Sequence, residues 1–370
     1  MAEPNVPMLV SDLSAGWLTG ALREAGHLGT SDMVSGLRAE PFGEGVGMVG
    51  QLARLHVTYS GPTDLPSTFI VKLPSPYEAN RTQMQQFRYY VREALFYREV
   101  APRAGVRTPR CWWSAVDHEN ALSAILLEDV SHLSSPDQIT GMSPDLAERA
   151  VRAIARFHAR WWQSSELDSI DWMDYGNGPI TMGAVPLFQF AWPMFLDNGF
   201  RALLTDEQVA LGERVRDRFG SLLTDFGGEP RTICHTDFRS ENMFFGEPGT
   251  EDEFVLIDWQ LTTRSGGIYD VSYLLAQSLT VEDRRAHEER LLRTYHDELT
   301  SGGVEVSFEE VRDFYRIGLM VCLVIPVSVG GMLDMANDRG RLLAETITER
   351  TFTAAIDLDC GALLDEKYPG

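Results

Sequence analysis

The stretch that decides the fold of this chain is ICHTDFRSENMFF at residues 233–245, followed closely by FVLIDWQ at residues 254–260. Apolar runs precede Asp258 and follow Asn242, so both side chains are expected at strand ends, where they project into a cleft. Together they offer the hard oxygen ligands that Mg²⁺ prefers, with positions left for substrate phosphates. Asp237 then remains available to accept a proton from a hydroxyl nucleophile. Acidic and amide residues after strands also commonly cap turns, and this stretch alone leaves both interpretations open.

A glycine-rich segment upstream suits the same chemistry. FGEGVGMVG, residues 42–50, lies between two predicted strands. Its Gly43, Gly45 and Gly47 would let the backbone approach phosphate oxygens and offer N–H groups to them. The segment lacks the GxxxxGK[ST] spacing of a Walker-type loop. A flexible hairpin loop is the other interpretation.

One lysine interrupts the apolar run FIVKL at residues 69–73. On a strand, Lys72 either faces water or is held inside by an anion. Glu93, on the following predicted helix, is a candidate partner that would orient the ammonium group. The alternative is a solvated lysine and an ordinary glutamate on a helix surface.

Hydrophobic periodicity divides the chain into a strand-rich first third and a helix-rich remainder, which predicts an α+β protein. Antiparallel strands are expected at residues 51–59, 68–73, 110–116 and 121–128, interrupted by one helix over residues 81–100.

The pattern becomes helical after the last predicted strand. Ser143-Pro144-Asp145 is a helix start, with a capping hydroxyl and proline in the first turn, and the helix should continue to about Trp162. We therefore expect an N-terminal lobe over residues 1–127, a hinge linker over 128–132, and a C-terminal lobe over 133–370.

The charge and cysteine content of the chain exclude some classes of binding partner and site. The 370 residues carry 32 Lys plus Arg against 54 Asp plus Glu, a net charge of −22, which disfavours nucleic acid and anionic membrane surfaces as partners. The four cysteines have neither metal-ligand spacing nor the density of a disulfide scaffold. The N-terminus lacks a signal-peptide pattern, and the apolar stretch 319–333 is short and interrupted, as in a buried core helix. We expect a cytoplasmic protein.

Taken in chain order, the glycine loop, strand lysine, helix glutamate, HxDxxxxN motif and strand aspartate resemble the protein-kinase-like fold. The details resemble its aminoglycoside-phosphotransferase and choline-kinase-like branch, which phosphorylates small molecules. ILLEDV at residues 125–130, AVRAIARFHARWW at 150–162 and DWQ at 258–260 are most similar to the ecdysteroid-kinase-like phosphotransferases. The resemblance extends over roughly residues 35–350. It implies two lobes, a small antiparallel-sheet N-lobe and a larger, mainly helical C-lobe.

The resemblance also implies roles for particular residues, with ATP as phosphoryl donor and Mg²⁺ as cofactor. Asp237 would be the catalytic base, and Asn242 and Asp258 would hold Mg²⁺ on the nucleotide phosphates. Arg239 lies between base and metal ligand, where a cation could steady the transferring phosphoryl group; a surface arginine is the equal alternative.

Further implied roles concern nucleotide binding and support. Lys72 would contact the α- and β-phosphates, paired with Glu93. The backbone of the linker would meet the nucleobase, and two further residues would brace the catalytic loop. These linker residues are Glu128, Asp129 and Val130, and the bracing residues are His235 and Asp270.

The phosphoryl acceptor stays open at this stage. An aromatic belt is a candidate acceptor wall, although each member could equally be core: Trp161, Trp172, Tyr175, Phe190 and Trp192. The acidic composition favours a cationic acceptor such as an aminoglycoside, whereas the belt favours a sterol-like or hydroxyacyl acceptor. The replacement of DFG by DWQ and the lack of an APE-type segment disfavour protein substrates.

We therefore expect an ATP- and Mg²⁺-dependent kinase of a small hydroxylated molecule. Two alternatives are kept: a catalytically silent nucleotide-binding regulatory module on the same fold, and a metal-dependent hydrolase that uses the same Asp, Asn and His residues.

Overall fold

The computed structural model describes residues 6–43, 50–228, 230–332 and 337–369. The chain forms two compact units. The first comprises Met1–Leu133 and Val255–Leu261, and the second comprises Ser134–Phe254 and Thr262–Gly370. Residues 255–261, which we expected with the C-terminal lobe, thus group with the first unit.

The first unit is built on a five-stranded antiparallel sheet in the order β1-β2-β3-β5-β4. Its strands are β1 (Val34–Phe42), β2 (Gly50–Tyr59), β3 (Thr68–Pro74), β4 (Cys111–Asp117) and β5 (Leu122–Glu128). The four strands for which the sequence gives bounds are present, and β1 is the strand expected before the glycine-rich segment, for which no bounds were predicted. Along β2, the alternate residues Ala53, Leu55 and Val57 are buried, as a strand with one core face requires.

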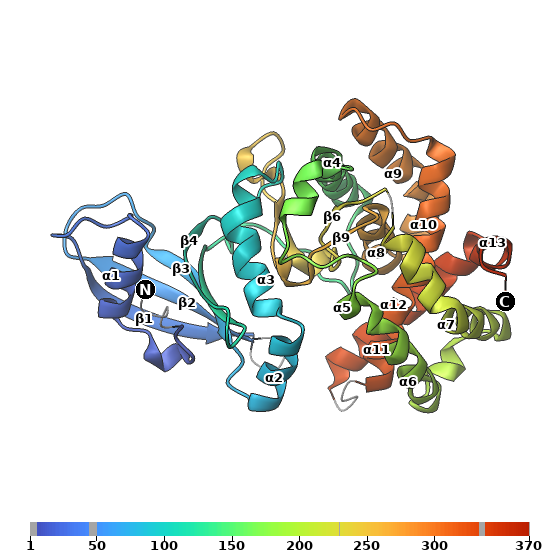
Figure 1. The fold of residues 1–370 in the computed structure, drawn as a ribbon, viewed down its shortest axis with the longest axis horizontal. Coiled ribbons are helices and arrows are strands. Elements are labelled where there is room, and N and C mark those ends of the chain that lie inside the picture. Colours follow the sequence, from blue (N-terminus) through green and yellow to red (C-terminus); the bar gives the residue numbers. More distant parts are fainter. Residues whose placement is uncertain (1–5, 44–49, 229, 333–336, 370) are drawn as a thin grey trace. The chain divides into compact units, whose positions relative to one another are not determined.

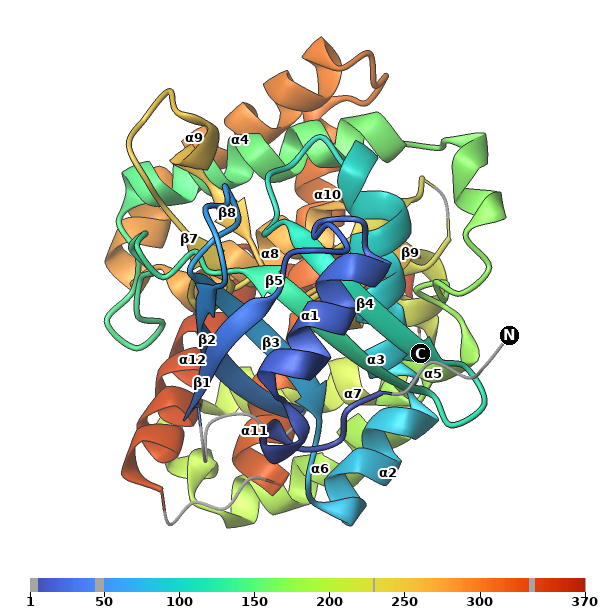
Figure 2. The same cartoon turned by 90° about the vertical axis from the view of Figure 1, so that its left-hand side faces the viewer.

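Helices cover both faces of this sheet. Figures 1 and 2 show α1 (Ala15–Glu24) and α3 (Tyr89–Leu95) on opposite faces. Because both faces are covered, every residue from Ala124 to Leu127 on β5 is buried rather than every second one.

The single helix expected over residues 81–100 is broken into three parts. It consists of α2 (Glu78–Gln86), α3 and a π-helical turn at Phe96–Val100. The break lies at Arg88, whose φ of 55° is in the left-handed region that a continuing α-helix cannot adopt. The 3.6-residue periodicity survives the break, which explains why the sequence pattern did not reveal it.

The second unit is mainly helical (Figure 1). Its longer helices are α4 (Pro144–Trp161), α6 (Ala184–Asp197), α7 (Asp206–Phe226), α8 (Ile268–Ser278), α9 (Val281–Ser301), α10 (Phe308–Cys322), α11 (Val324–Met332), α12 (Asp338–Asp357) and α13 (Cys360–Lys367); α5 (Pro179–Met182) is a single turn. Helix α4 packs along α9, α8 against α10, and α6 against α11. As predicted, Ser143 caps α4: its hydroxyl accepts a hydrogen bond from Leu146 N.

A short antiparallel ladder in the second unit positions the HxDxxxxN segment. Strand β6 (Thr232–Cys234) pairs with β9 (Thr263–Ser265), in a register that sets Cys234 opposite Thr263. A 3₁₀ turn at Ser240–Asn242 and the short strand β7 (Met243–Phe244) follow. In the first unit, β8 (Val255–Leu256) ends two residues before Asp258.

Within the described part of the chain, two helical stretches are long and apolar enough to cross a membrane by length and composition, Pro179–Asp197 and Phe308–Met332. In the second, 72% of the 18-residue apolar window is buried, as is common for the core helix of a soluble protein. This second stretch contains the apolar stretch that we expected to be buried, here divided between α10 and α11. The first stretch includes α6.

Candidate active site

Lys72 lies between two carboxylates in the first unit. Strand β3 carries Lys72 and helix α3 carries Glu93, and the lysine Nζ is 2.6 Å from Glu93 Oε1. The same Nζ lies 3.1 Å from Asp258 Oδ1. We call these three residues the Lys72 cluster. One ammonium thus serves two carboxyl groups, and when both are ionised the cluster retains negative charge that a further cation can compensate.

Burial and mutual charge determine the protonation of this cluster. Burial raises the pKa of Glu93 to about 7, with Lys72 opposing the rise and Asp258 adding to it. Burial by itself lowers the pKa of Lys72, but Asp258 and Glu93 together raise it above its ordinary value. The lysine therefore keeps its positive charge throughout the physiological pH range.

Asp258 is fixed by the backbone and by its neighbour in the chain. Its φ of 67° is left-handed, a conformation that non-glycine residues adopt at a cost. Trp259 stacks on Phe96 with ring centroids 3.9 Å apart, and its Nε1 donates to Leu256 O at 3.2 Å. The tryptophan of the DWQ motif thus anchors the segment that presents Asp258 to Lys72.

The second unit presents Asp237 on the segment of residues 235–242, which we call the Asp237 loop. Asn242 Nδ2 donates to Asp237 Oδ2 at 2.8 Å and to the carbonyl oxygen of the same residue at 2.9 Å. The Tyr273 hydroxyl, on α8, also hydrogen-bonds the Asp237 side chain. These contacts fix the carboxylate while 15% of its side chain remains exposed.

Arg239 belongs to the same loop and is tied into it. Its Nε lies 3.3 Å from Asp237 Oδ1, and its Nη1 pairs with the Glu241 carboxylate. Nη1 also lies 3.4 Å from Gln138 Oε1. With 26% of its side chain exposed, Arg239 is a constrained cation beside Asp237 rather than a solvated surface arginine.

Asp270, on α8, holds the backbone at the start of the Asp237 loop by hydrogen bonds. Its two carboxylate oxygens accept the N–H groups of His235 and Thr236, at 2.7 and 2.8 Å. Thr236 has a left-handed φ of 65°, and the bidentate contact holds this turn in place. His235 Nδ1 accepts a hydrogen bond from Asp237 N at 3.3 Å. Asp270 thus contacts the loop from α8, whereas His235 is the first residue of the loop itself; their bracing role stays a prediction.

A buried group beneath the loop resembles a metal site. The ligand atoms of His158, Cys234 and Asp270 all lie within 4.8 Å of one another. Both nitrogens of His158 are engaged, however: Nδ1 with Tyr295 Oη at 2.9 Å and Nε2 with Asp270 Oδ2 at 3.1 Å. His158 is thus a core histidine with its hydrogen bonds satisfied, and this group fits a hydrogen-bond network better than a metal centre.

The predicted Mg²⁺ ligands fit a hard cation by their donor atoms. Among the described residues, no donor contacts Asn242 Oδ1, because the contacts of this side chain are made by Nδ2. Asp258 offers a carboxylate that is 22% exposed within a cluster of negative charge. An amide oxygen and a carboxylate are ligands that Mg²⁺ accepts.

The side chains of the predicted hinge are committed to structural contacts. Glu128 pairs with Arg107 at 2.8 Å and accepts from Arg110 N at 2.9 Å, while Asp129 pairs with Arg54 at 2.8 Å. Val130 is buried. Contact of this linker with a nucleobase through its backbone stays a prediction.

The remaining predicted residues are dispersed. Gly43 is described, with a φ of 73°, whereas Gly45 and Gly47 lie outside the described residues. Of the aromatic belt, Trp161 and Trp192 are core residues at 0% and 2% exposure, Phe190 is 63% exposed, and Trp172 and Tyr175 are half-buried. The five aromatic residues therefore do not share one exposed wall.

Sequence reasoning missed Tyr273 and Gln138 as neighbours of the Asp237 loop. A signal existed for Tyr273, because it follows Asp270 by three residues on α8 and so lies on the same helix face. Gln138 lies in an irregular segment before α4, and no sequence pattern indicates its position.

Comparison with known proteins identifies the chain. Residues 44–303 match the sequence model of the ecdysteroid kinase-like family, well over half of the chain. The chain belongs to this family. An uncharacterized kinase-like protein of Caenorhabditis elegans is 25% identical to this ecdysteroid kinase-like chain over 240 residues. The match covers 60% of the chain and only 61% of that relative.

Solved structures show the same fold as this family member. A choline kinase from Cryptosporidium parvum has a TM-score of 0.54 at 12% identity, covering 89% of this chain and 90% of that one. A putative aminoglycoside phosphotransferase from Ralstonia eutropha has a TM-score of 0.50 at 17% identity, covering 92% and 97%. An amicoumacin kinase has a TM-score of 0.53 at 11% identity, covering 85% and 88%. The expected α+β class and protein-kinase-like fold are confirmed.

Proposed function

We propose that this protein transfers the γ-phosphoryl group of ATP to a hydroxyl group of a small molecule. The observation that carries the proposal is Lys72, a charged lysine fixed between Glu93 and Asp258 in a chain of the ecdysteroid kinase-like family. An ammonium held by two carboxylates is oriented to meet phosphate oxygens, and phosphoryl transfer depends mainly on positioning and charge neutralisation.

In this proposal the two units contribute different groups. Lys72 binds the nucleotide phosphates, and Asp258 and Asn242 hold Mg²⁺, which when bound neutralises phosphate charge. Asp237 accepts the hydrogen bond, and then the proton, of the acceptor hydroxyl, in an orientation fixed by Asn242 and Tyr273. Arg239 provides positive charge beside Asp237, where it stabilises the transferring phosphoryl group.

Thermal unfolding with ATP and Mg²⁺ tests the nucleotide part. At a ligand concentration a hundred times Kd, binding stabilises the folded state by about 2.7 kcal/mol, which shifts Tm by a few degrees. We expect the shift to disappear with EDTA and in Asp258→Asn. The matched control is Asp64→Asn, an exposed aspartate of the same unit, which should keep the full shift. The absence of any nucleotide-dependent shift in the wild-type protein would contradict the proposal.

An ADP-release screen tests the transfer itself. It begins with the three acceptor classes expected from the sequence: aminoglycosides, sterol-like alcohols and hydroxyacyl thioesters. The amicoumacin kinase of the same fold was solved with AMP-PNP, Ca²⁺ and Ami, which supports supplying nucleotide, divalent cation and acceptor together. ADP release that requires both an acceptor and Asp237 would establish kinase activity. Nucleotide binding without turnover of any acceptor would instead favour the catalytically silent regulatory module.

A further inference from the structure

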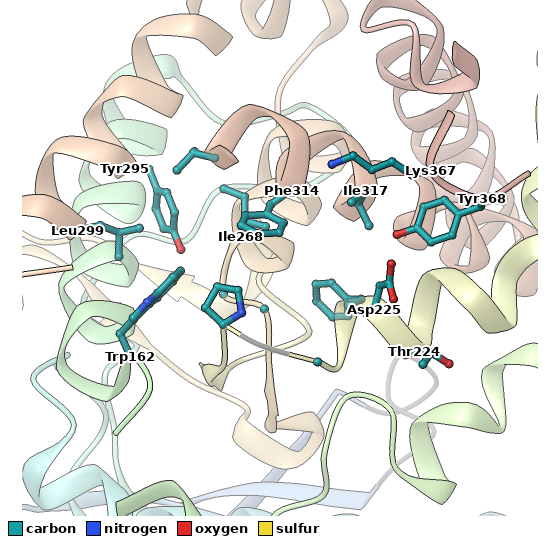
Figure 3. Close-up of a pocket in the computed structure, with 16 residues that line it drawn as sticks. Trp162, Thr224, Asp225, Ile268, Tyr295, Leu299, Phe314, Ile317, Lys367 and Tyr368 are labelled. Atoms are coloured by element: carbon teal, nitrogen blue, oxygen red, sulfur yellow. The ribbon is translucent and has the colours of Figure 1, made fainter. Parts of the chain in front are cut away.

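The second unit contains a cavity of about 300 Å³. That volume is at the small end of the range for ligand-binding pockets. Residues from the ends of α4 and α7, the start of α8, α9, α10 and the C-terminal segment line it (Figure 3). Among the described residues that line it, none belongs to the Asp237 loop.

The cavity is apolar at one end and polar at the other. Figure 3 shows Trp162, Tyr295 and Leu299 together on one side, and Asp225 and Tyr368 on the opposite side. Aromatic and aliphatic walls bind a flat apolar ring, because they remove its surface from water. A molecule that fills this cavity therefore needs a ring at one end and a polar group at the other.

The charge at the polar end selects a cationic head. Asp225 lies in the last turn of α7, where the helix carbonyls add partial negative charge. The ammonium of Lys367 also lines the cavity, but it pairs at 3.0 Å with Asp313 Oδ2, a carboxylate that Arg316 also approaches at 3.7 Å, and not with Asp225. Among the described residues, no cationic side chain is paired with the Asp225 carboxylate. An amine is the head group that complements this end.

The apolar end connects to the Asp237 loop by hydrogen bonds. Tyr295 lines the cavity, and its hydroxyl lies 2.9 Å from His158 Nδ1. His158 Nε2 lies 3.1 Å from Asp270 Oδ2, and Asp270 accepts the N–H groups of His235 and Thr236. Tyr295, His158 and Asp270 are at most 1% exposed, so water does not compete for these bonds. Three consecutive hydrogen bonds thus link the cavity wall to the loop backbone.

We propose that this cavity binds a small aromatic amine, and that its occupancy stabilises the Asp237 loop through Tyr295, His158 and Asp270. An occupant packed against Tyr295 restricts the motion of its ring, so the hydrogen-bonded chain opens less often. That stabilising the Asp237 loop would regulate activity rests on the proposed function. Binding of the amine to the cavity, and its effect on the loop, do not.

Calorimetry with tryptamine tests the binding. We expect tryptamine to bind the full-length protein, and its anionic counterpart indole-3-propionate to bind at least about tenfold more weakly. Asp225→Asn should weaken tryptamine binding about tenfold, the scale of a hydrogen bond to a charged group. Asp217→Asn, at an aspartate with a 63% exposed side chain on the same helix, is the matched control and should change nothing. Failure of tryptamine to bind, or equal affinity for Asp225→Asn and wild type, overturns the proposed site.

Hydrogen–deuterium exchange tests the coupling without requiring catalysis. Tryptamine should slow exchange of the peptide that contains the His235 and Thr236 amides. In Tyr295→Phe the ring remains and only the hydroxyl is lost, so tryptamine should still bind but no longer slow this exchange. Thr224→Trp, at the exposed rim, should block binding and slowing together. Unchanged exchange in the wild type, or undiminished slowing in Tyr295→Phe, overturns the coupling. Because neither readout involves ATP, these failures differ from a failure of the kinase proposal.

Discussion

The Lys72 cluster of the first unit and the Asp237 loop of the second each present an aspartate beside a left-handed residue. In the first, the strained residue is Asp258 itself; in the second, it is Thr236, directly before Asp237. Their surroundings differ. Asp258 shares one ammonium with Glu93, whereas Asp237 receives hydrogen bonds from several donors. The first arrangement leaves charge for a cation, and the second fixes the direction of a carboxylate oxygen.

The largest expected effect follows from removing the carboxylate charge of the Asp237 loop. Asp237→Asn keeps the shape of the side chain but cannot accept a proton, so the acceptor-dependent kcat should fall by about 10²–10⁴-fold. The nucleotide-induced rise in Tm should remain, because Lys72 and Asp258 are unchanged and Asn242 keeps its amide oxygen for Mg²⁺. Asp217→Asn serves as control for both assays. Activity within tenfold of the wild type would remove Asp237 as the base.

A substitution at Asp270 tests whether this residue stabilises the fold of the Asp237 loop without taking part in the reaction. Asp270→Asn replaces one acceptor oxygen by a donor that faces a backbone N–H, and the position is fully buried. We expect the free energy of unfolding to fall by about 3 kcal/mol or more, measured by urea titration. Asp237→Asn should change it by much less, since Asp237 is partly exposed. Equal destabilisation by the two substitutions would contradict the distinction between them.

Lys72→Arg tests whether the first cluster needs a compact cation. A planar guanidinium cannot take the place of an ammonium between Glu93 and Asp258 without displacing one of them. We expect kcat/KM for ATP to fall by about 10²-fold, the scale of one lost electrostatic contact. Lys367→Arg, on the surface of the other unit, is the matched control. Near-normal kcat/KM in Lys72→Arg would show that charge alone suffices.

Tyr273→Phe should give the smallest effect. It removes one hydrogen bond to Asp237 and leaves the ring packed on α8, so kcat should fall by about tenfold. KM for ATP should be unchanged, because the substitution leaves every residue of the Lys72 cluster and its ion pairs intact. If instead KM for ATP changed and kcat did not, the assignment of Tyr273 to the Asp237 loop would be wrong.

The sequence predicted the fold well where periodicity and order determine it. Four strands, the capped helix after Ser143 and the kinase-like order of motifs all follow from local patterns. It also predicted the ion pair of Lys72 with Glu93, although their functional roles stay predictions. A further signal was available: of the 32 basic residues only Lys72 and Lys367 are lysines, so a lysine inside an apolar strand is exceptional in this chain.

Other features depend on tertiary contacts that local patterns do not encode. The break at Arg88 preserves the helical spacing on either side, and nothing in the sequence marks it. The aromatic belt was treated as one surface, yet Trp161 and Trp192 are core while Phe190 faces solvent. Aromatic residues are common in both environments, so composition could not separate them.

The return of Val255–Leu261 to the first unit has a consequence for how the protein is made. Phe96 stacks on Trp259, Leu256 N donates to Arg107 O at 3.0 Å, and Lys72 pairs with Asp258. These partners leave the ribosome only after some 120 residues of the second unit have been synthesised. Until then, the Phe96 ring of the nascent first unit is not covered by Trp259, and Lys72 lacks Asp258 as a partner. A ribosome-bound chain of which only the residues up to 254 have left the exit tunnel should be a better chaperone client than one of which residue 261 has also emerged.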